Sequence, residues 1–583
     1  MASGAWSPGS RRWEVAAPLA GAEAFGRGLG VAPLVAQMLH NRGIDTPQGA
    51  RAFLDPKLGD LHDPALLGGT AEAAARIALA VRRGERIVIY GDYDVDGMTA
   101  VAILHAFLTM VGADVHYYVP HRLEEGYGVN TEAVRKLLAD GVRLLITVDC
   151  GIGAVAPLAE AAAGGADIVV TDHHSPPDRL PAAAAIVHPC IPPGRYPNPH
   201  LSGAGVAFKL AWALAREICG SEKVDEPMRD FLLNATCLAA LGTIADVVPL
   251  IGENRVIATF GLRGLPGSKH VGLRALLESA RLTGERLDAY HVGFVLAPRL
   301  NACGRMGHAR LAVELLTSAP KDRCIEIAEY LAKQNTERQR VEREITSQAE
   351  ELVRTRGLAG PDHRAIVLAS DAWHGGVIGI VASRLVSLFH RPVILIALDG
   401  DGIAQGSGRS IPGFDMCEAL AACGEHLVGF GGHAMAGGLK ILPERIDAFT
   451  KAMSDCARAA IGDEALVPVV RIDAESTVGS LRYPVVAQLC KLAPFGQGNP
   501  PPVVALRGCE VRTAPRRMGR RGQAVSFHLG QGDASLRAVG FGMGDLADLL
   551  AGVKRVDVAG EPGLNTFQGA THVELKLKDV VWK

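Results

Sequence analysis

Aspartate and histidine residues concentrate at four places in the first half of the chain. The set comprises Asp92, Asp94, Asp96, Asp149, Asp172, His173, His174 and Asp246. Hard divalent cations such as Mg²⁺ prefer carboxylate oxygens, and imidazole adds affinity for transition ions such as Mn²⁺. These groups are more than one ion needs, so the pattern predicts a site for two ions, either Mn²⁺ or Mg²⁺.

Two such ions, about 3.5 to 4 Å apart and sharing a carboxylate, have a well-defined chemistry. They activate a water molecule and stabilise both the entering and the leaving oxygen of a phosphoryl transfer. The predicted reaction class is therefore the hydrolysis of phosphoesters.

Other interpretations of the same residues are weaker. The motif D-Y-D-V-D-G from Asp92 matches the first half of a calcium-binding EF-hand loop, but position 12 is Ile103 instead of glutamate. A D-H-H run alone fits a solvated turn, whereas this one follows a strand-like run beside two other acidic strand ends. We expect His105, His121 and His188 to be surface histidines or satisfied core histidines.

Between Glu85 and His174, strand-like and helix-like runs alternate along the chain. The predicted strands are RIVIYGD, DVHYYVP, VRLLITVDC and ADIVVTDHH, and the predicted helices between them are GMTAVAILHAFLTMVG, TEAVRKLLADG and AVAPLAEAAAGG. This alternation predicts an α/β fold with a doubly wound parallel sheet. Because such sheets place their sites at the carboxyl ends of the strands, the aspartates that follow the strands are expected to meet.

The rest of the chain predicts three further parts. Residues 321 to 356 contain no Gly or Pro and alternate in charge, which indicates one long polar helix. A second α/β unit follows, with the strands RAIVLAS and PVILIAL, and the short strands beyond about Pro468 indicate a β-barrel. The predicted organisation is an N-terminal segment at 1–60, a catalytic α/β domain at 61–320, a connecting helix at 321–357, a second α/β domain at 358–464 and a barrel at 465–583.

Composition sets the class of protein. The chain has 583 residues, of which 48% are hydrophobic and 21% charged, and this excludes a small disulfide scaffold and a mainly disordered chain. The net charge of −2 leaves only local patches to bind a polyanion. Scattered cysteines and the lack of a long apolar stretch predict a cytoplasmic protein without a membrane span. Without a GxxxxGK[ST] phosphate loop, nucleotide-driven motor activity is not expected.

The four acidic motifs resemble, in order, those of the DHH phosphoesterase superfamily. They are D-Y-D-V-D-G at 92–97, V-D-C-G at 148–151, D-H-H at 172–174 and G-T-I-A-D-V-V-P-L at 242–250. Further motifs resemble its branch of bacterial exonucleases specific for single-stranded DNA, and the match covers nearly the whole chain. They are A-P-R-L-N-A-C-G-R-M at 297–306, W-H-G-G-V-I-G-I-V-A-S-R at 373–384, G-S-G-R-S at 406–410, G-G-H-A-M-A-G-G at 431–438 and P-F-G-Q-G-N-P-P-P at 494–502. Smaller phosphatase relatives have a histidine where this chain has Tyr90, which favours the nuclease branch.

The resemblance implies a role for each acidic residue. The implied metal ligands are Asp94, Asp96, Asp149, His173 and Asp246, with Asp149 as the bridge between two ions. The implied catalytic residues are Asp92, Asp149, Asp172 and His174. Within that set, Asp92 and Asp172 support the ligands, and His174 contacts the scissile phosphate. The implied fold is a parallel-sheet DHH catalytic domain, the connecting helix, a DHH-associated α/β domain and a C-terminal barrel like an OB-fold.

Phosphate binding needs cations, because a cleft of carboxylates repels the substrate. The candidate substrate-binding residues are Arg122, Arg299, Asn301, Arg305, Ser407, Arg409 and His433. We expect G-S-G-R-S to form a glycine-rich turn whose backbone amides and arginine grip a phosphate, with an ordinary surface turn as the alternative. In the barrel, a basic cluster is expected to follow a single strand, with a solvated loop as the alternative. It comprises Arg512, Arg516, Arg517, Arg520 and Arg521.

The activity that the resemblance implies is metal-dependent hydrolysis of single-stranded DNA from the 5′ to the 3′ direction, in recombination and repair. The implied partners are single-strand binding protein and a RecQ-type helicase, and the chain is expected to be a monomer. Two alternatives remain open. One is a DHH phosphodiesterase acting on short RNA or cyclic dinucleotides, although those relatives are shorter and generally lack the barrel. The other is a non-catalytic member that binds single strands, although such members lose metal ligands that are all present here.

Overall fold

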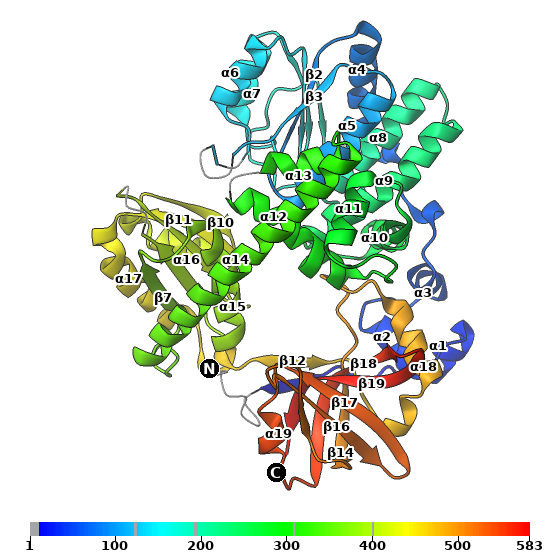
Figure 1. The fold of residues 1–583 in the computed structure, drawn as a ribbon, viewed down its shortest axis with the longest axis vertical. Coiled ribbons are helices and arrows are strands. Elements are labelled where there is room, and N and C mark those ends of the chain that lie inside the picture. Colours follow the sequence, from blue (N-terminus) through cyan, green and yellow to red (C-terminus); the bar gives the residue numbers. More distant parts are fainter. Residues whose placement is uncertain are drawn as a thin grey trace. The chain divides into compact units, whose positions relative to one another are not determined.

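The computed structural model describes residues 11–121, 125–126, 128–191, 196–306, 309–398 and 402–582 (Figure 1). The chain forms two compact units. Unit 1 contains Met1–Ala50, Glu337–Lys491 and Pro502–Lys583, and unit 2 contains Arg51–Thr336 and Leu492–Pro501.

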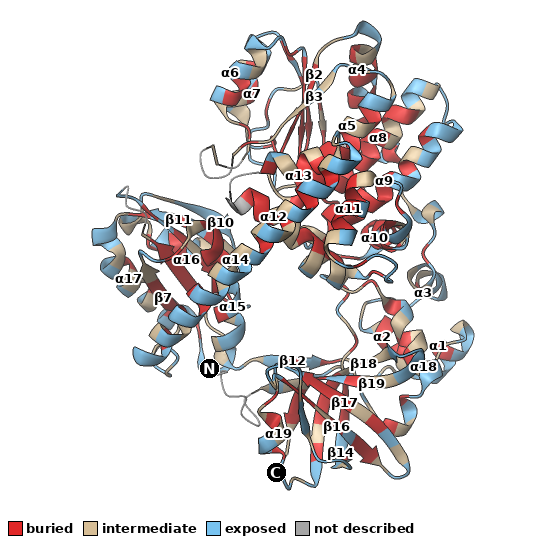
Figure 2. Ribbon diagram, in the orientation of Figure 1, coloured by how far each residue is buried: buried red, intermediate tan, exposed pale blue. Residues whose placement is uncertain are grey.

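Unit 2 is built on the predicted parallel sheet, whose strands lie in the order β3-β2-β4-β5-β6. The strands are β2 (Ile87–Gly91), β3 (Val115–Tyr118), β4 (Leu144–Val148), β5 (Asp167–Thr171) and β6 (Ala185–Val187). Every residue of β2 and β4 is buried (Figure 2), as expected for central strands that helices cover on both faces.

The two faces of this sheet carry separate apolar cores. Ile87 and Ile89 of β2 belong to the larger core, whereas the alternate residues Val88 and Tyr90 pack into the other core, since successive side chains of a strand point to opposite faces. The larger core includes α4 (Thr70–Arg83), α5 (Val95–Met110), α8 (Gly203–Cys219) and α9 (Glu226–Ala245). The other includes α6 (Thr131–Ala139) and α7 (Val155–Ala163). The sheet is therefore doubly wound.

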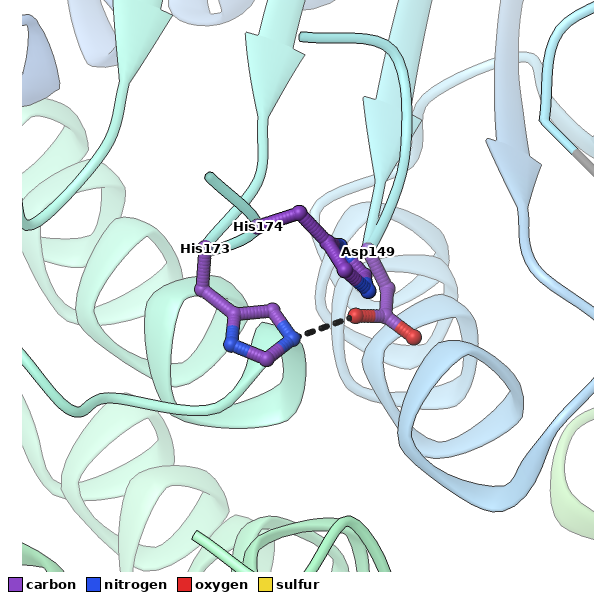
Figure 3. Close-up of side chains that lie close together, drawn as sticks. All are labelled: Asp149, His173 and His174. Carbon is purple, nitrogen blue, oxygen red and sulfur yellow. Dashed lines mark ion pairs between the residues drawn. The ribbon is translucent and has the colours of Figure 1, made fainter. Parts of the chain in front are cut away.

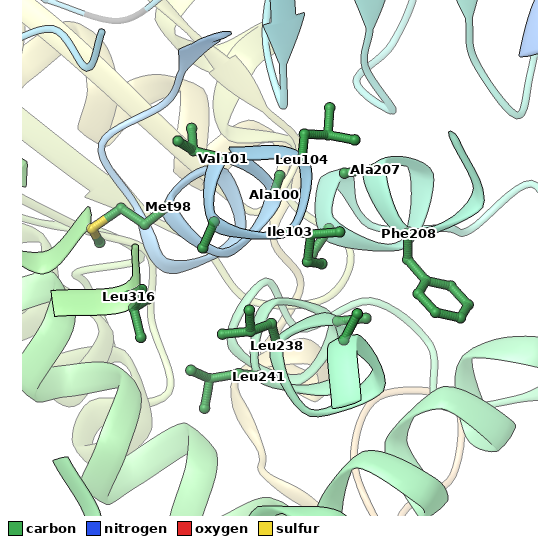
Figure 4. Close-up of a cluster of buried hydrophobic side chains, with 14 of the residues drawn as sticks. Met98, Ala100, Val101, Ile103, Leu104, Ala207, Phe208, Leu238, Leu241 and Leu316 are labelled. Carbon is green, nitrogen blue, oxygen red and sulfur yellow. The ribbon is translucent and has the colours of Figure 1, made fainter. Parts of the chain in front are cut away.

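Helix α5 is the centre of unit 2. Its side chains are apolar on every side and pack against α8, α9 and α13 (Ala309–Leu316), as Figure 4 shows around Met98, Ile103 and Leu241. A helix that is apolar all round is stable only when it is buried. Its N-terminal turn, which carries Asp94 and Asp96, is therefore fixed rigidly at the end of β2.

The helices that complete unit 2 are α10 (Gly252–Gly264), α11 (Val271–Ser279) and α12 (Ala297–Met306). Residues 492–501 also pack here, although they are distant in sequence. Arg255 of α10, which is 2% exposed, donates from Nη1 to Leu492 O and from Nη2 to Ala493 O, both at 2.8 Å. Buried carbonyls paired in this way hold the segment in place.

The predicted long helix is α14 (Lys321–Thr355), and its residues divide between the two units at Thr336. In unit 1, a mixed sheet follows in the order β10-β11-β9-β8-β7. It contains β7 (Ile366–Ser370), β8 (Val393–Ala397), β9 (Ala404–Arg409), β10 (Gly429–His433) and β11 (Ala436–Ile441), with helices α15 (Gly375–Phe389), α16 (Met416–Ala422) and α17 (Ile446–Ala460). Helix α15 packs into one core of this sheet, and α16 and α17 pack into another.

The C-terminal part of unit 1 is the predicted barrel. Its strands lie in the order β13-β14-β18-β19-β17-β16-β15, and the pairing of β14 with β16 closes the sheet. They are β13 (Ala474–Ser476), β14 (Val504–Val511), β15 (Arg516–Met518), β16 (Ala524–Gln531), β17 (Ala534–Phe541), β18 (Arg555–Phe567) and β19 (Ala570–Val581), with helices α18 (Tyr483–Leu489) and α19 (Leu546–Leu549).

The N-terminal elements are β1 (Arg12–Val15), α1 (Ala22–Leu29), α2 (Pro33–His40) and α3 (Pro47–Leu54). Strand β1 pairs in parallel with β12 (Val469–Ile472), and Trp13 Nε1 donates to the buried carboxylate of Asp579 at 2.6 Å. This N-terminal strand is therefore part of the same unit as the barrel.

Across the described ranges, no single helix is long and apolar enough to cross a membrane, and the bent pair Leu58–Leu66 with Thr70–Arg83 meets the criteria of length and composition only.

Candidate metal centre

Three neighbouring strands of unit 2 end at the acidic motifs. Strand β2 leads to Asp92, β4 leads to Asp149, and β5 leads to the run from Asp172 to His174. These strands are parallel and adjacent, so their carboxyl ends lie at one edge of the sheet. Asp246 reaches the same place as the C-terminal cap of α9.

The ligand atoms lie within coordination range of one another. His173 Nε2 is 3.0 Å from Asp149 Oδ1 (Figure 3), 3.6 Å from Asp246 Oδ2 and 3.7 Å from Asp96 Oδ2. Three groups each bring potential ligand atoms within 4.8 Å of one another: Asp149 with His173 and His174, Asp96 with His173 and Asp246, and Asp92 with Asp94 and Asp149. Asp149 and His173 each belong to two of these groups. A carboxylate has two oxygens and can bind two ions, whereas His173 faces the cluster through Nε2 alone, so Asp149 is the residue suited to being shared.

The residues present fit bound cations. Asp149 Oδ1 and His173 Nε2 are both buried and lie 3.0 Å apart, but neither makes a well-aligned hydrogen bond to any described residue. Buried polar atoms without partners are costly, and a divalent cation between them removes that cost. Oxygen ligands with imidazole suit Mn²⁺ and also admit Mg²⁺.

The backbone conformation at Asp149 and the glycine at the start of α8 allow α8 to lie very close to the Asp149 carboxylate. Asp149 itself has φ 59°, in the left-handed region where aspartate is tolerated better than most residues. Gly203, at the start of α8, lies so near that a Cβ atom there would be 2.5 Å from Asp149 Oδ1. The same helix start donates the amides of Gly203 and Ala204 to the two oxygens of Asp96, at 2.6 and 2.9 Å. These amides, at the positive end of α8, favour the carboxylate form of Asp96, but burial, and then the charge of Asp94, outweighs them and raises the pKa of Asp96 to about 7.

The two adjacent histidines are held in opposite charge states. Burial, and then the charge of His174, lowers the pKa of His173 to about 4, so its imidazole is neutral and suited to ligation at pH 7. Burial alone would also lower the pKa of His174. The hydrogen bond from its Nδ1 to Asp172 at 2.7 Å, together with the charge of Asp172, outweighs burial and raises that pKa to about 9. His174 therefore carries a positive charge at the site.

The carboxylate of Asp172 accepts hydrogen bonds from the backbone of its own loop and of the loop that follows β4. One of its oxygens accepts from the amides of His173 and His174, and the other accepts from the amide of Ile152 at 3.0 Å. His188, which we expected to be a surface or core histidine, is buried, and its Nε2 pairs with the carbonyl of His174 at 2.8 Å. These contacts fix the direction in which both histidine rings point.

The acidic cluster predicts how stability depends on pH without metal. Burial, and then the charges of Asp96 and Asp94, raises the pKa of Asp246 to about 8, against about 3.9 in an unfolded chain. Because the folded value is the higher one, the stability linked to this group is complete below about pH 4 and is lost as the pH rises through 8. In chelator, Asp246→Asn should therefore unfold a few degrees above wild type at pH 8, with a smaller gain at pH 5. Thermal unfolding at both pH values checks this, and an equal gain at both would contradict it.

Comparison with known proteins identifies the family. Residues 86–239 match the DHH family N-terminal domain, 362–459 match the DHHA1 domain and 472–579 match the RecJ OB domain. The single-stranded-DNA-specific exonuclease RecJ of Bacillus subtilis (strain 168) is 39% identical over 570 residues, which cover 97% of this chain and 70% of that protein. The chain belongs to the RecJ family. The expected resemblance and the predicted fold class are thereby confirmed.

Solved RecJ structures support the same assignment. RecJ from Thermus thermophilus in complex with Mn²⁺ matches with a TM-score of 0.83 and 35% identity, over 98% of this chain and 80% of that one. The structure of that protein in complex with Mg²⁺ matches with a TM-score of 0.75 and 32% identity, over 98% and 78% of the two chains. Both of the predicted metal ions are therefore cofactors found in this family.

Several predicted substrate-binding residues meet on one sheet of the DHHA1 domain. Arg409 of β9 pairs with Ala436 of β11, which pairs with His433 of β10, so the three lie in one row across the sheet. Ser407 lies two residues before Arg409, on the same face, and its Oγ accepts from Arg409 Nη1 at 3.0 Å. The sheet thus places a guanidinium, a hydroxyl and an imidazole on one face.

The expectation of a glycine-rich turn at G-S-G-R-S is wrong. Residues Ala404–Arg409 form strand β9, which pairs with β8 on one side and β11 on the other. Backbone amides within this ladder are already paired, so the segment offers side chains to an anion. Its glycines allow close packing instead, since a Cβ atom at Gly406 would lie 2.7 Å from the Leu439 side chain.

The remaining predicted residues have different surroundings. Arg299 of α12 is half-buried, and its Nη1 donates to the carbonyl of Val295 at 2.6 Å, which directs the group to its own helix. Asn301 is partly exposed on the same helix. Arg122 and the side chain of Arg305 lie outside the described residues.

Part of the predicted basic cluster in the barrel is neutralised. Arg517 forms ion pairs with Asp545 at 3.2 Å and Asp548 at 2.6 Å, and Arg512 Nη2 donates to the carbonyl of Gly532. Arg516, Arg520 and Arg521 are exposed. The positive charge that this loop offers to a strand is therefore smaller than its arginine content suggests.

Proposed function

We propose that this chain degrades single-stranded DNA in the 5′ to 3′ direction, with the metal centre of unit 2 as its active site. Members of the RecJ family are metal-dependent exonucleases on single-stranded DNA, and this chain has that activity. The direction of degradation, the number of ions and the role of each residue are our proposals. The observation that carries the two-ion site is that Asp149 belongs to two groups of potential ligands, and the direction is proposed from membership of the RecJ family.

The proposed ligands are Asp94, Asp96, Asp149, His173 and Asp246. When bound there, Mn²⁺ or Mg²⁺ ions lower the pKa of a coordinated water and neutralise charge on the reacting phosphate. Asp149 would be shared by the two ions, and neutral His173 would complete the set without adding positive charge. Asp92 lies beside Asp94 and Asp149 and supports them.

His174 acts on the phosphate and not on the metals. The hydrogen bond to Asp172 keeps its proton in place at pH 7 and fixes the direction of its ring. A fixed N–H donor at the edge of the metal site stabilises negative charge that builds on a phosphate oxygen as the bond breaks. Asp172 and His188 are positioning residues for this donor.

A second set of residues captures the phosphate at the 5′ end. Arg409 presents a planar guanidinium that can hold phosphate through two parallel hydrogen bonds, with Ser407 beside it and His433 in the same row of the sheet. Asn301, Arg299, Arg122 and Arg305 remain predicted substrate contacts. The barrel follows the rest of the strand by charge, without sequence preference.

Helix α15 sets the position of Arg409, which gives a specific prediction. A Cβ atom at Gly379 would lie 2.9 Å from Ser407 Oγ and 3.0 Å from Arg409 Nη2. Gly379→Ala should therefore move these side chains, while alanine improves helix propensity by about 1 kcal/mol. We expect the preference for a 5′-phosphate over a 5′-hydroxyl end to fall about tenfold.

The matched control is Gly375→Ala, because a Cβ atom there would meet only Gln405 Oε1, at 3.7 Å. The effect is measured by comparing cleavage rates on oligonucleotides that carry a 5′ phosphate with rates on oligonucleotides that carry a 5′ hydroxyl. If both variants keep the wild-type end preference, Arg409 does not hold the 5′ phosphate.

The protein partners and the location are also proposals. Single-stranded DNA is the substrate, and we propose single-strand binding protein and a RecQ-type helicase as protein partners, a cytoplasmic location and a monomeric state. A diesterase restricted to short RNA is less favoured because the closed barrel is present, and a non-catalytic member is less favoured because the ligand set is complete.

The direction of degradation is tested with one strand labelled at either end. With Mn²⁺, a 5′ label should appear at once as mononucleotide, whereas a 3′ label should pass through a ladder of shortening strands. The reverse pattern would contradict the proposed direction.

A further inference from the structure

Two aromatic side chains lie exposed and stacked on unit 2. Tyr290 is 62% exposed and Phe294 is 70% exposed, and their ring centroids are 5.0 Å apart with an angle of 24° between the planes. Aromatic residues make up only 5% of the chain, and most large apolar side chains of this unit are buried. Two stacked aromatic rings that are exposed to solvent form a surface that can bind a ligand with a flat, apolar face.

The pair belongs to a helix that leads to the metal centre. Tyr290 precedes η4 (His291–Leu296), a π-helix that continues directly into α12. Segments of this kind are rare and occur often at functional sites. Val292, Leu296 and Leu300 bury the inner side of this helix.

The outer side of the helix forms a strip that consists of Tyr290, Phe294, Pro298 and Asn301, all exposed or partly exposed. Their spacing of four, four and three residues places them on one face. Three residues further, Gly304 touches the metal loop, since a Cβ atom there would lie 2.8 Å from the carbonyl oxygen of Tyr93, the residue between Asp92 and Asp94. The strip therefore leads from the aromatic pair toward the metal ligands.

We propose that this strip is a stacking platform for the bases of the single strand, about four nucleotides from the bond that is cleaved. The proposal rests on the proposed function. Ten residues of helix separate Phe294 from Gly304, which is about 15 Å, and stacked nucleotides rise about 3.4 Å each. Ring-to-base stacking tolerates any sequence, because every base has a flat face.

The size and charge of the strip favour bases over a protein partner. Two aromatic rings can bury about 300–500 Å², well below the roughly 800 Å² per partner of a stable protein interface. Between residues 280 and 304, all of which the structure describes, Tyr290 and Phe294 are the large apolar side chains that are exposed. Asp288 engages His291 at 2.6 Å, and Arg299 points to its own helix, so the strip offers flat faces and little positive charge.

The test compares Phe294→Ala and Phe294→Leu with wild type on three substrates that carry a 5′ phosphate: a trinucleotide, a 12-nucleotide strand, and the same strand with abasic sites at nucleotides 4 to 6. Leu233→Ala, which removes an exposed apolar side chain of α9, is the control for surface truncation. On the intact 12-nucleotide strand, Phe294→Ala should lower kcat/KM about 5- to 150-fold, and Phe294→Leu should recover little because leucine is not flat. The trinucleotide should be cleaved at the wild-type rate.

The abasic strand separates stacking from structural support. The kcat/KM of wild type should fall as much on the abasic strand as the kcat/KM of Phe294→Ala falls on the intact strand. Phe294→Ala on the abasic strand should show no further loss, because the variant and the abasic sites remove the same contact. Equal losses on the trinucleotide and the long strand would mean that Phe294 only supports α12, and would overturn the proposal. Unchanged cleavage of all three substrates by Phe294→Ala would also overturn it and leave the pair as a protein contact. If wild type cleaves none of them, the proposed function fails instead.

Discussion

Asp149→Ala should reduce cleavage of single-stranded DNA by at least about 10³-fold, which is the largest effect we expect from a single change. Asp149 is shared between two of the three ligand groups, so its loss removes a ligand from both proposed ion positions. The remaining carboxylates would then repel one another. Binding of the strand should persist, since Arg409 and its neighbours lie in another unit.

A second variant separates chemistry from folding. Because Asp149 has φ 59°, alanine is strained there, whereas asparagine tolerates this conformation and keeps the size of the side chain. Asp149→Asn should therefore fold in chelator and still lose activity. Its midpoint should lie at or above that of wild type, because the change removes a carboxyl whose pKa is raised by burial and by the charges of Asp96 and Asp94. Asp230→Asn, on the exposed surface of α9, is the control for loss of one negative charge. Cleavage by Asp149→Asn within tenfold of wild type, with Mn²⁺ binding unchanged, would remove the claim of a shared ligand.

His173→Ala and His174→Ala should both lose nuclease activity, but for different reasons, although the two residues are adjacent. His174→Ala should lower kcat about 10²- to 10³-fold, the usual cost of removing one donor to a transition-state oxygen, with Mn²⁺ affinity near wild type. His173→Ala should weaken Mn²⁺ binding, and excess metal should restore part of its activity. The opposite charge states of the two rings, with pKa values of about 4 and 9, underlie this difference.

Isothermal titration with Mn²⁺ and single-turnover cleavage at saturating metal distinguish the two variants. Asp172→Asn is a useful third variant, because it should reduce activity by lowering the pKa of His174 while the His174 ring stays present. If His174→Ala binds Mn²⁺ as weakly as His173→Ala does, His174 is a metal ligand and its proposed role is incorrect.

The sheet of unit 2 was predictable because its strands are short apolar runs bounded by acidic or glycine residues, as IVIYG before Asp92 shows. The same runs placed the strand-end aspartates correctly, since parallel strands must end together. Strand β6 was not predicted, because its three residues, AIV, are too few to show the alternation of apolar and polar residues that indicates a strand. Strand β9 was not predicted because local propensity favours a turn at G-S-G-R-S, and pairing with β8 and β11 overrides it.

The supporting residues of the site could not be predicted from local patterns. Asp96 accepts hydrogen bonds from the start of α8, more than 100 residues later in the chain, and nothing near Gly203 in sequence indicates that contact. His188 was expected to be an ordinary histidine, and its role in holding His174 depends on how β6 returns to the sheet. Sequence motifs indicate which groups perform the chemistry, whereas the groups that orient them depend on tertiary packing.

The most direct test of the central claim is digestion of end-labelled single-stranded DNA, duplex DNA and single-stranded RNA by wild type with Mn²⁺, Mg²⁺ or chelator. We predict release of mononucleotides from single-stranded DNA with either metal, no cleavage in chelator, and little attack on a blunt duplex. Cleavage that persists in chelator would contradict the metal centre, and cleavage confined to short RNA would contradict the assignment of the substrate.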